Sequence, residues 1–216
     1  MHAQALDLDL LEDALAGDLP GVDAQLRLAH PARRLAPPGG AEPRQAGVLV
    51  LLYPGAEGQL HFPLIVRASH NPNDRHRGQI SLPGGKREPG DRSLVDTALR
   101  EAEEEVGADA SAVRVIGQLS RLYIPVSNFS VQPVLGVTDR APAWRRQETE
   151  VERVIDAPLA RLLADDVVKH TEMPVGAGVR LRNVPYFDVG GEVVWGATAM
   201  ILSELRTVVS GLVAQR

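Results

Sequence analysis

The distribution of hydrophobic and polar positions predicts alternating strands and helices. Apolar runs of strand length stand at 47–53 (GVLVLLY) and 61–68 (HFPLIVRA), separated by the turn-forming segment PGAEGQL. Two such runs around a short Gly- and Pro-containing segment predict a β-hairpin with one or both faces buried. Shorter apolar runs predict further strands at 79–82, 113–120, 130–138, 178–187 and 192–195.

A helical period replaces the strand pattern between residues 93 and 106, and Gly107 is well placed as a C-terminal cap. This helix carries an apolar stripe that is suited to packing on a sheet. The stripe consists of Val95, Ala98, Leu99, Ala102 and Val106. Weaker helical patterns predict helices at 5–16, 157–166 and 198–215.

The segment 30–45 (HPARRLAPPGGAEPRQ) is rich in proline and glycine, which is typical of a connecting loop. We therefore divide the chain into residues 1–45, an N-terminal helix and connecting segment packed on the domain, and a main domain at 46–216. The order of strands and helices predicts an α/β fold in which the Glu-rich helix packs on a mixed sheet. The apolar helix at 198–215 suits packing on the domain or on a second subunit, as in a homodimer.

Composition narrows the class of protein. The 216 residues carry a net charge of −5, which gives no general attraction to nucleic acid or to an anionic membrane. The absence of cysteine excludes thiol nucleophiles and thiolate metal sites, and fits a reducing cytoplasm. The acidic N-terminal start does not match a secretory signal, and the longest uncharged run, 122–138, contains two prolines. We expect a cytoplasmic protein with no membrane or nucleic-acid partner.

The candidate chemistry lies in the Glu-rich helix. Glu101, Glu104 and Glu105 stand at i, i+3 and i+4 and share one helix face, where like charges repel. They also lie near the C-terminal end of the helix, which disfavours anions. One interpretation is a solvated charge run, helped by ion pairs to Arg100. The other is a hard-cation site for Mg²⁺ or Mn²⁺, which the adjacent Gly84-Gly85 turn favours because glycine allows close backbone approach.

The stretch GGKREPGDRSLVDTALREAEEEVGA, 84–108, resembles the Nudix box, the motif of hydrolases that cut a nucleoside diphosphate linked to another group. There are departures from the motif. Its first acidic position is Asp91, eight residues instead of seven precede Arg100, and Ala102 and Ala108 fill aliphatic positions. The matching residues are Gly85, Arg100, Glu101, Glu104, Glu105 and Gly107.

The resemblance implies a Nudix α/β/α sandwich around a mixed sheet, with the box as a loop–helix–loop. It implies that Glu101, Glu104 and Glu105 bind Mg²⁺ or Mn²⁺, with the Gly85 carbonyl as a further ligand. Arg100 would orient the glutamates through ion pairs.

The proton acceptor of such an enzyme is either the box glutamate at the Glu101 position or a glutamate outside the box. Glu150, in ETEVERVIDAPLARLL, resembles the outside glutamate. Its neighbours Glu148 and Glu152 remain alternatives.

The sequence upstream of the box bears on the substrate. RHRGQISLPGG, 75–85, resembles a second motif of the coenzyme A diphosphatase branch, although Gln79 replaces an acid and Leu82 an aromatic residue. Arg67 fits the basic residue of that motif, and the 69–75 loop lacks its expected Leu-Arg pair. The resemblance implies cleavage of coenzyme A to 3′,5′-ADP and 4′-phosphopantetheine. The candidate substrate-binding residues are Arg67, His76, Gly78, Gln79, Ser81 and Asn128.

Two alternatives stay open. The substrate could be ADP-ribose, a nucleotide sugar or a dinucleoside polyphosphate, because specificity depends on loops far from the box. A Nudix-fold binding module without catalysis is the other alternative, although such proteins usually lose box glutamates, which are all present here.

Overall fold

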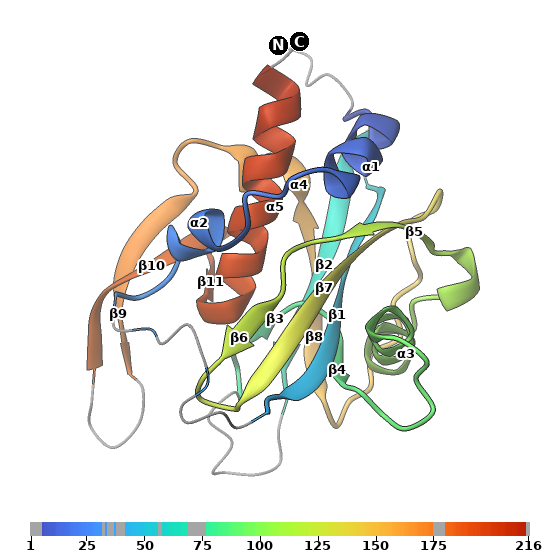
Figure 1. The fold of residues 1–216 in the computed structure, drawn as a ribbon, viewed down its shortest axis with the longest axis horizontal. Helices are drawn as coiled ribbons and strands as arrows, with labels where there is room; N and C mark the ends of the chain where they lie inside the picture. The colour runs from blue at the N-terminus through green and yellow to red at the C-terminus, as the bar shows by residue number, and fades with distance from the viewer. Residues whose placement is uncertain are drawn as a thin grey trace.

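The centre of the molecule is a mixed β-sheet of eight strands (Figure 1). These are β1 (Arg44–Pro54), β2 (Leu60–Arg67), β3 (Ile80–Ser81), β4 (Gly84–Lys86), β5 (Arg114–Gln118), β6 (Leu122–Ile124), β7 (Phe129–Val137) and β8 (Val151–Pro158). Five of them follow the order β3-β2-β1-β7-β5, and β4 pairs with β1, β6 with β7 and β8 with β2. The central pair β1–β7 is parallel, whereas β1 pairs with β2 and with β4 in antiparallel fashion.

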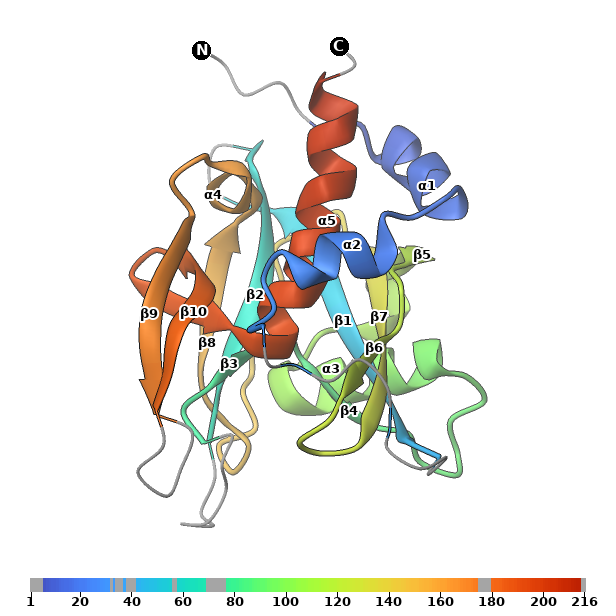
Figure 2. The ribbon, with the colours of Figure 1, turned by 60° about the vertical axis from the view of Figure 1, so that its left-hand side comes forward.

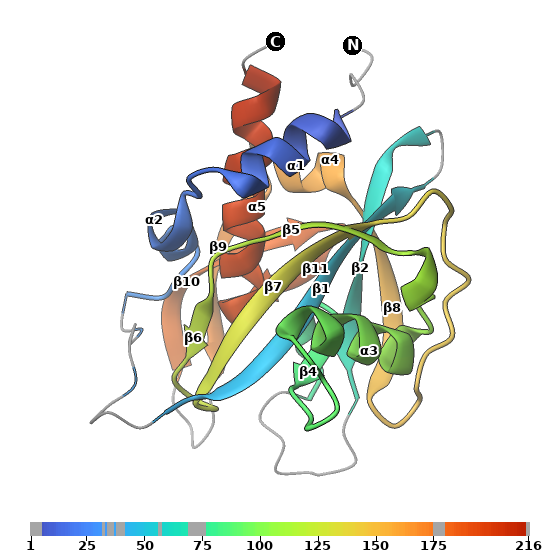
Figure 3. The same ribbon diagram turned by 45° about the vertical axis from the view of Figure 1, so that its right-hand side comes forward.

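This computed structural model describes residues 6–31, 33, 37, 42–55, 58–68, 77–174 and 180–214. Its helices are α1 (Leu8–Ala16), α2 (Gly21–Leu26), α3 (Leu94–Val106), α4 (Leu159–Leu163) and α5 (Gly196–Ala214), with a short 3₁₀ helix at Ala110–Ala112. Helix α3 covers one face of the main sheet, and α1, α2 and α5 cover the other (Figure 3).

The alternation of side chains along β1 divides the core into two layers. Leu49 and Leu51 point towards α3 and pack with its apolar stripe. Val50 and Leu52 point to the opposite face and join the larger cluster around α5. Because successive residues of a strand face opposite sides, a strand buried on both faces is apolar throughout. The uninterrupted apolar run in β1 therefore reflects its place between two helical layers.

Local sequence explains both ends of α3. The hydroxyl of Ser93 accepts a hydrogen bond from the Asp96 backbone N–H, and the Asp96 carboxylate accepts one from the Ser93 N–H, which together form a capping box. Gly107 ends the helix in the left-handed conformation, with φ 71°. A side chain at Gly47 of β1 would place Cβ 2.4 Å from the Leu94 carbonyl oxygen, so this glycine allows α3 to lie close against the sheet.

A second, three-stranded antiparallel sheet leads into α5 (Figure 2). Its order is β11-β10-β9, and β11 contacts β3 of the main sheet. Trp195 ends β11 directly before Gly196, which has φ 64° and turns the chain into α5. The three strands are β9 (Val168–Pro174), β10 (Arg180–Val189) and β11 (Glu192–Trp195).

The α/β class, the mixed sheet and the packing of the Glu-rich helix on it are confirmed. The helices predicted at 93–106 and 198–215 correspond to α3 and α5. The prediction of a helix over 157–166 is wrong in its extent. The first two residues of that range end β8, and α4 covers only Leu159–Leu163. Strands β4, β6, β8 and β9 and helix α2 are additional to the predicted elements.

The N-terminal segment lies against α5. Leu11 and Leu15 of α1 are buried in the same cluster as α5 residues, and Gln25 of α2 donates a hydrogen bond of 2.9 Å to the buried Glu204. Strand β1 begins at Arg44, two residues before the boundary that the sequence favours. The division into 1–45 and 46–216 stays a prediction.

Helix α5 is long and apolar enough to cross a membrane by length and composition, among the helices of the described ranges. Of its most apolar stretch, 56% is buried inside the protein. A core helix passes the same test, so length and composition alone are weak evidence for a membrane span. The predicted cytoplasmic location stays a prediction.

Candidate active site

A cavity of about 820 Å³ lies where α3, β1 and β4 meet β3, β6 and the start of α5. Two chemical groups of side chains line it. The carboxylates are Glu88, Glu101, Glu104, Glu105 and Glu150. The apolar residues include Val48, Ile80, Leu82, Ile124, Phe129, Val131, Trp195 and Ile201. A single cavity thus joins a dense negative cluster to an apolar wall.

The Gly84-Gly85 turn brings backbone and carboxylates together. Gly84 has φ 151°, and its N–H donates a hydrogen bond of 2.8 Å to Oε2 of Glu105. A Cβ at Gly84 would lie 2.4 Å from the carbonyl oxygen of Gly47, and a Cβ at Gly85 would lie 2.4 Å from Oε2 of Glu101. Gly84 therefore requires glycine because it meets backbone atoms, whereas a side chain at Gly85 would displace the Glu101 carboxylate.

Arg100 ties the loop before α3 to the carboxylates on the helix. Its Nε and Nη2 donate to the two carboxylate oxygens of Asp91 at 2.9 and 3.0 Å. Its Nη1 donates to Glu104 at 3.1 Å, and Nη2 lies 3.0 Å from Oε1 of Glu101. Hydrogen bonds from Arg100 hold the pKa of Asp91 well below its usual range. The same bonds to Asp91 raise the pKa of Arg100.

Glu105 is the most buried carboxylate of the cavity, with 2% of its surface exposed. Burial raises its pKa to about 7, although the Gly84 N–H and the charge of Arg67 oppose the rise. Nη1 of Arg67 lies 3.8 Å from Oε1 of Glu105. Burial also raises the pKa of Glu101, against the lowering effect of Arg100, while Glu104 has a side chain that is 59% exposed. The three box glutamates thus occupy three different environments.

Glu150 reaches the cavity from the loop before β8. Its backbone carbonyl accepts a hydrogen bond of 2.7 Å from Ala68 N–H, which fixes this loop beside the end of β2. Its charge contributes to the raised pKa values of Glu101 and Glu105. The neighbouring Glu148 is not among the lining residues and pairs with Arg146 at 3.1 Å. Of the glutamates outside the box that the sequence analysis proposes as proton acceptors, Glu150 is the one that lines the cavity.

The carboxylates do not form a ready-made metal cluster in the described part of the chain. Arg100 draws Glu101 and Glu104 towards itself, and Gly84 and Arg67 hold Glu105. The donor set nevertheless fits a hard divalent cation, because carboxylate oxygens are its preferred ligands and a buried carboxylate of raised pKa gains most from a cation.

The predicted substrate-binding residues separate into two groups. Arg67, Gln79 and Ser81 line the cavity. Gly78 and Asn128 do not line the cavity. Both lie in turns, with φ of 72° and 50°. The side-chain oxygen of Asn128 accepts a hydrogen bond of 3.0 Å from Tyr123. The predicted site residue His76 lies outside the described residues.

The roles of two residues in the site are not predicted from the sequence. Asp91 acts as the bidentate partner of Arg100 and is 7% exposed. Arg33, in the Pro-rich segment, lines the cavity although it stands far from the box in sequence. The acidic position of the box motif signals Asp91, whereas no sequence pattern singles out Arg33.

A sequence profile described as the NUDIX domain matches residues 43–164. The chain belongs to the Nudix family. The match spans β1 to α4 and includes α3 with all three box glutamates. Nudix hydrolases generally use divalent metal ions.

Relatives of this Nudix chain include Nudix hydrolase 22, chloroplastic, of Arabidopsis thaliana, which is 37% identical over 171 residues covering 77% of this chain and 56% of the relative. NudL of Salmonella paratyphi B, named as an uncharacterized Nudix hydrolase, is 37% identical over 162 residues, covering 75% and 81%. The chain thus spans little more than half the length of the Arabidopsis relative. The crystal structure of RenU, a Nudix hydrolase from M. Smegmatis, aligns with a TM-score of 0.54 and 16% identity over 78% of this chain and 87% of RenU, which supports the fold.

Proposed function

We propose that this Nudix protein is a metal-dependent diphosphatase that cleaves coenzyme A or its derivatives to 3′,5′-ADP and 4′-phosphopantetheine. The observation that carries this proposal is the cavity that joins five glutamates to an apolar wall. In the proposed site Glu101, Glu104 and Glu105 hold Mg²⁺ or Mn²⁺, and the carbonyl of Gly85 is an additional ligand.

The charge of the cavity is the argument for a cation. A diphosphate cannot approach five carboxylates without compensation, because like charges in a partly buried site repel strongly. When bound, a divalent ion neutralises phosphate oxygens and lowers the pKa of a coordinated water. Arg67 and Lys86 line the same cavity and supply further positive charge.

The residues of the chain position the reaction. Gly84 orients Glu105 through its N–H, and Arg100 orients Glu101 and Glu104 while Asp91 fixes Arg100. A carboxylate must accept the proton of the attacking water. Glu150 and Glu101 are the two candidates, and Glu150 is favoured since it lacks an ion pair to Arg100 and faces the cavity from a separate loop.

The apolar wall favours coenzyme A among the possible substrates. The pantetheine arm of coenzyme A is long and uncharged, so it can lie along the apolar residues Ile80, Leu82 and Trp195 of the cavity. A second nucleotide or a sugar would place several hydroxyl groups against this surface, where unpaired polar groups are costly. Arg67, Gln79 and Ser81, from the motif that resembles the coenzyme A branch, line the same cavity.

The test is hydrolysis of coenzyme A by purified protein with Mg²⁺, with Mn²⁺ and with chelator, the products being resolved by mass. We expect metal-dependent release of 3′,5′-ADP and phosphopantetheine that Glu104→Gln abolishes. Glu103→Gln is the matched control, because Glu103 is an exposed glutamate of α3 that does not line the cavity. Cleavage of ADP-ribose or a dinucleoside polyphosphate but not of coenzyme A would reject the substrate. Binding without cleavage of any nucleotide would indicate a non-catalytic module.

A further inference from the structure

Two of the three buried polar side-chain atoms without a hydrogen-bond partner in the described chain lie on residues that line the cavity. They are Nε of Arg33 and Oγ of Ser81. Buried polar groups are nearly always paired in folded proteins, so unpaired groups that line one cavity point to a ligand that completes them.

Arg33 differs from the arginines of the box region. Arg67 and Arg100 form ion pairs with the box glutamates. Within the described ranges Arg33 has no carboxylate partner, and its Nη2 donates instead to the backbone carbonyl of Tyr123. Burial lowers the pKa of its guanidinium by desolvating the charged form. An anionic ligand would compensate that charge.

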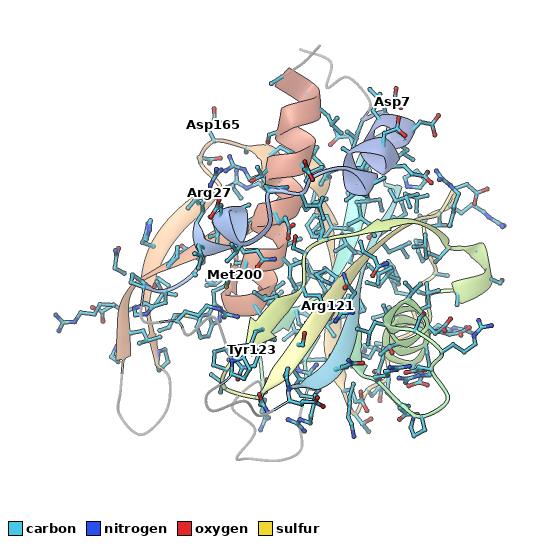
Figure 4. All side chains as sticks on the ribbon, in the orientation of Figure 1. Asp7, Arg27, Arg121, Tyr123, Asp165 and Met200 are labelled. Carbon is cyan, nitrogen blue, oxygen red and sulfur yellow. The ribbon has the colours of Figure 1, made fainter. Side chains whose placement is uncertain are left out.

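The place of Arg33 separates it from the carboxylate cluster. Its anchor, Tyr123, belongs to β6, and Figure 4 labels this residue. Strands β4, β1, β7 and β6 are successive neighbours, so about 14 Å separates β4 from β6 at about 4.8 Å per strand. At the same end of β7, Arg44 lies with Cζ 4.1 Å from the centroid of the Phe129 ring and adds positive charge.

We propose that Arg33 is a specificity-determining residue that binds a phosphomonoester of the substrate, remote from the diphosphate that is cut. The planar guanidinium matches phosphate oxygens, and its Nε is the donor left free. This inference rests on the proposed function, since coenzyme A carries such a group as its 3′-phosphate. The N-terminal segment thereby supplies part of the site, although the family profile begins only at residue 43.

Calorimetry with adenosine 3′,5′-bisphosphate and with AMP in the presence of Mg²⁺ tests the inference. The wild type is expected to bind the bisphosphate about tenfold to a hundredfold more tightly than AMP, as for a hydrogen bond to a charged group. Arg33→Gln should bring this ratio close to one. Arg27→Gln is the matched control: Arg27 is an exposed arginine of the same segment that follows α2 (Figure 4), and its loss should leave the ratio unchanged.

A wild type without preference for the bisphosphate overturns the inference, as does a folded Arg33→Gln variant that keeps the preference. Thermal unfolding establishes that the variant is folded. If Arg33→Gln does not fold, Arg33→Lys replaces it. Lysine keeps the positive charge but lacks the planar guanidinium. A reduced preference for the bisphosphate over AMP therefore supports the inference, and an unchanged preference contradicts it.

Hydrolysis of coenzyme A and of 3′-dephospho-coenzyme A separates this inference from the proposed function. We expect Arg33→Gln to lower kcat/KM for coenzyme A and to spare the dephospho substrate. An equal loss on both substrates contradicts the role of Arg33 and leaves the diphosphatase proposal intact. No cleavage of either substrate by the wild type, together with a bisphosphate preference that depends on Arg33, rejects the diphosphatase and retains the phosphate site.

Discussion

Arg100 and Asp91 form a two-pronged ion pair, with Nε to Oδ1 at 2.9 Å and Nη2 to Oδ2 at 3.0 Å. Asp91 also accepts hydrogen bonds of 2.9 Å from the Glu88 N–H and from the Thr97 hydroxyl. The carboxylate therefore connects the loop after β4, the first turns of α3 and the arginine that contacts Glu101 and Glu104. Eight residues separate Asp91 from Arg100, one more than in the Nudix motif, and the ion pair still forms.

Replacing Asp91 with asparagine should lower the free energy of unfolding by about 2 kcal/mol, the value of a lost hydrogen bond to a charged group. The loss is smaller than for a buried charge left without any partner, because Arg100 still pairs with Glu101 and Glu104. Urea unfolding at pH 7 measures the change. The control is Asp139→Asn, whose partner Arg140 forms an exposed pair that is expected to contribute little. Equal effects of the two substitutions would contradict the role of Asp91.

The two glycines before the box should respond differently to alanine. Gly84→Ala forces a side chain onto a left-handed backbone and against the Gly47 carbonyl, so we expect a large loss of stability. At Gly85 the atoms nearest to an added Cβ belong to the Glu101 carboxylate, so the protein should fold while its activity falls about a hundredfold through displacement of that group. Thermal unfolding and kcat/KM, measured on both variants, separate the effects. A fully active Gly85→Ala enzyme would show that the position of Glu101 is not critical.

Much of the fold follows from patterns within single segments. The period of α3 and the glycine at 107 predict a helix whose ends differ little from those observed. Strand β8 is harder to predict, because Glu152, Arg153 and Asp156 interrupt its apolar positions. It becomes a strand by pairing with β2, and that partner lies far away in sequence. Pairing across the sheet is thus the information that a local pattern lacks.

The same limit applies to the site. The i, i+3, i+4 spacing predicts that the box glutamates share a face, yet it cannot predict that Glu105 is buried while Glu104 is exposed. That difference depends on where α3 meets β4 and on the Gly84 N–H. Arg33 lines the cavity and donates a hydrogen bond to the carbonyl of Tyr123, which is 90 positions away in the chain. Local spacing therefore finds candidate ligands on one helix and misses residues that come from separate segments.

The raised pKa of Glu105 predicts that the metal-free protein loses stability as pH rises. Its pKa in the folded protein is about 7, above the value of about 4.3 expected when unfolded. The unfolded state then binds fewer protons between these values, so the free energy of unfolding should fall by up to about 4 kcal/mol across this window. Chemical unfolding in chelator from pH 4 to pH 8 measures it. Glu105→Gln should flatten the profile, and a slope that the variant retains must come from other groups.

The same carboxylate should couple pH to the effect of metal. Because a ligand must lose its proton to bind a cation, Mg²⁺ should stabilise the wild type more at pH 8 than at pH 5. Glu105→Gln removes a proposed ligand and should reduce the gain at pH 8. The rise in thermal midpoint on adding Mg²⁺, recorded at both pH values, is the measurement. An identical rise at the two values would argue against Glu105 as a ligand.

Glu150 is expected to act as the proton acceptor. Glu150→Gln should lower kcat on coenzyme A by about a hundredfold to ten-thousandfold, the range for removal of a general base, with little change in KM. Glu148→Gln is the matched control, because Glu148 stands two residues away and pairs with Arg146 outside the cavity. If Glu150→Gln keeps the wild-type kcat and Glu101→Gln loses the acidic limb of the pH–kcat profile, the base is Glu101 instead.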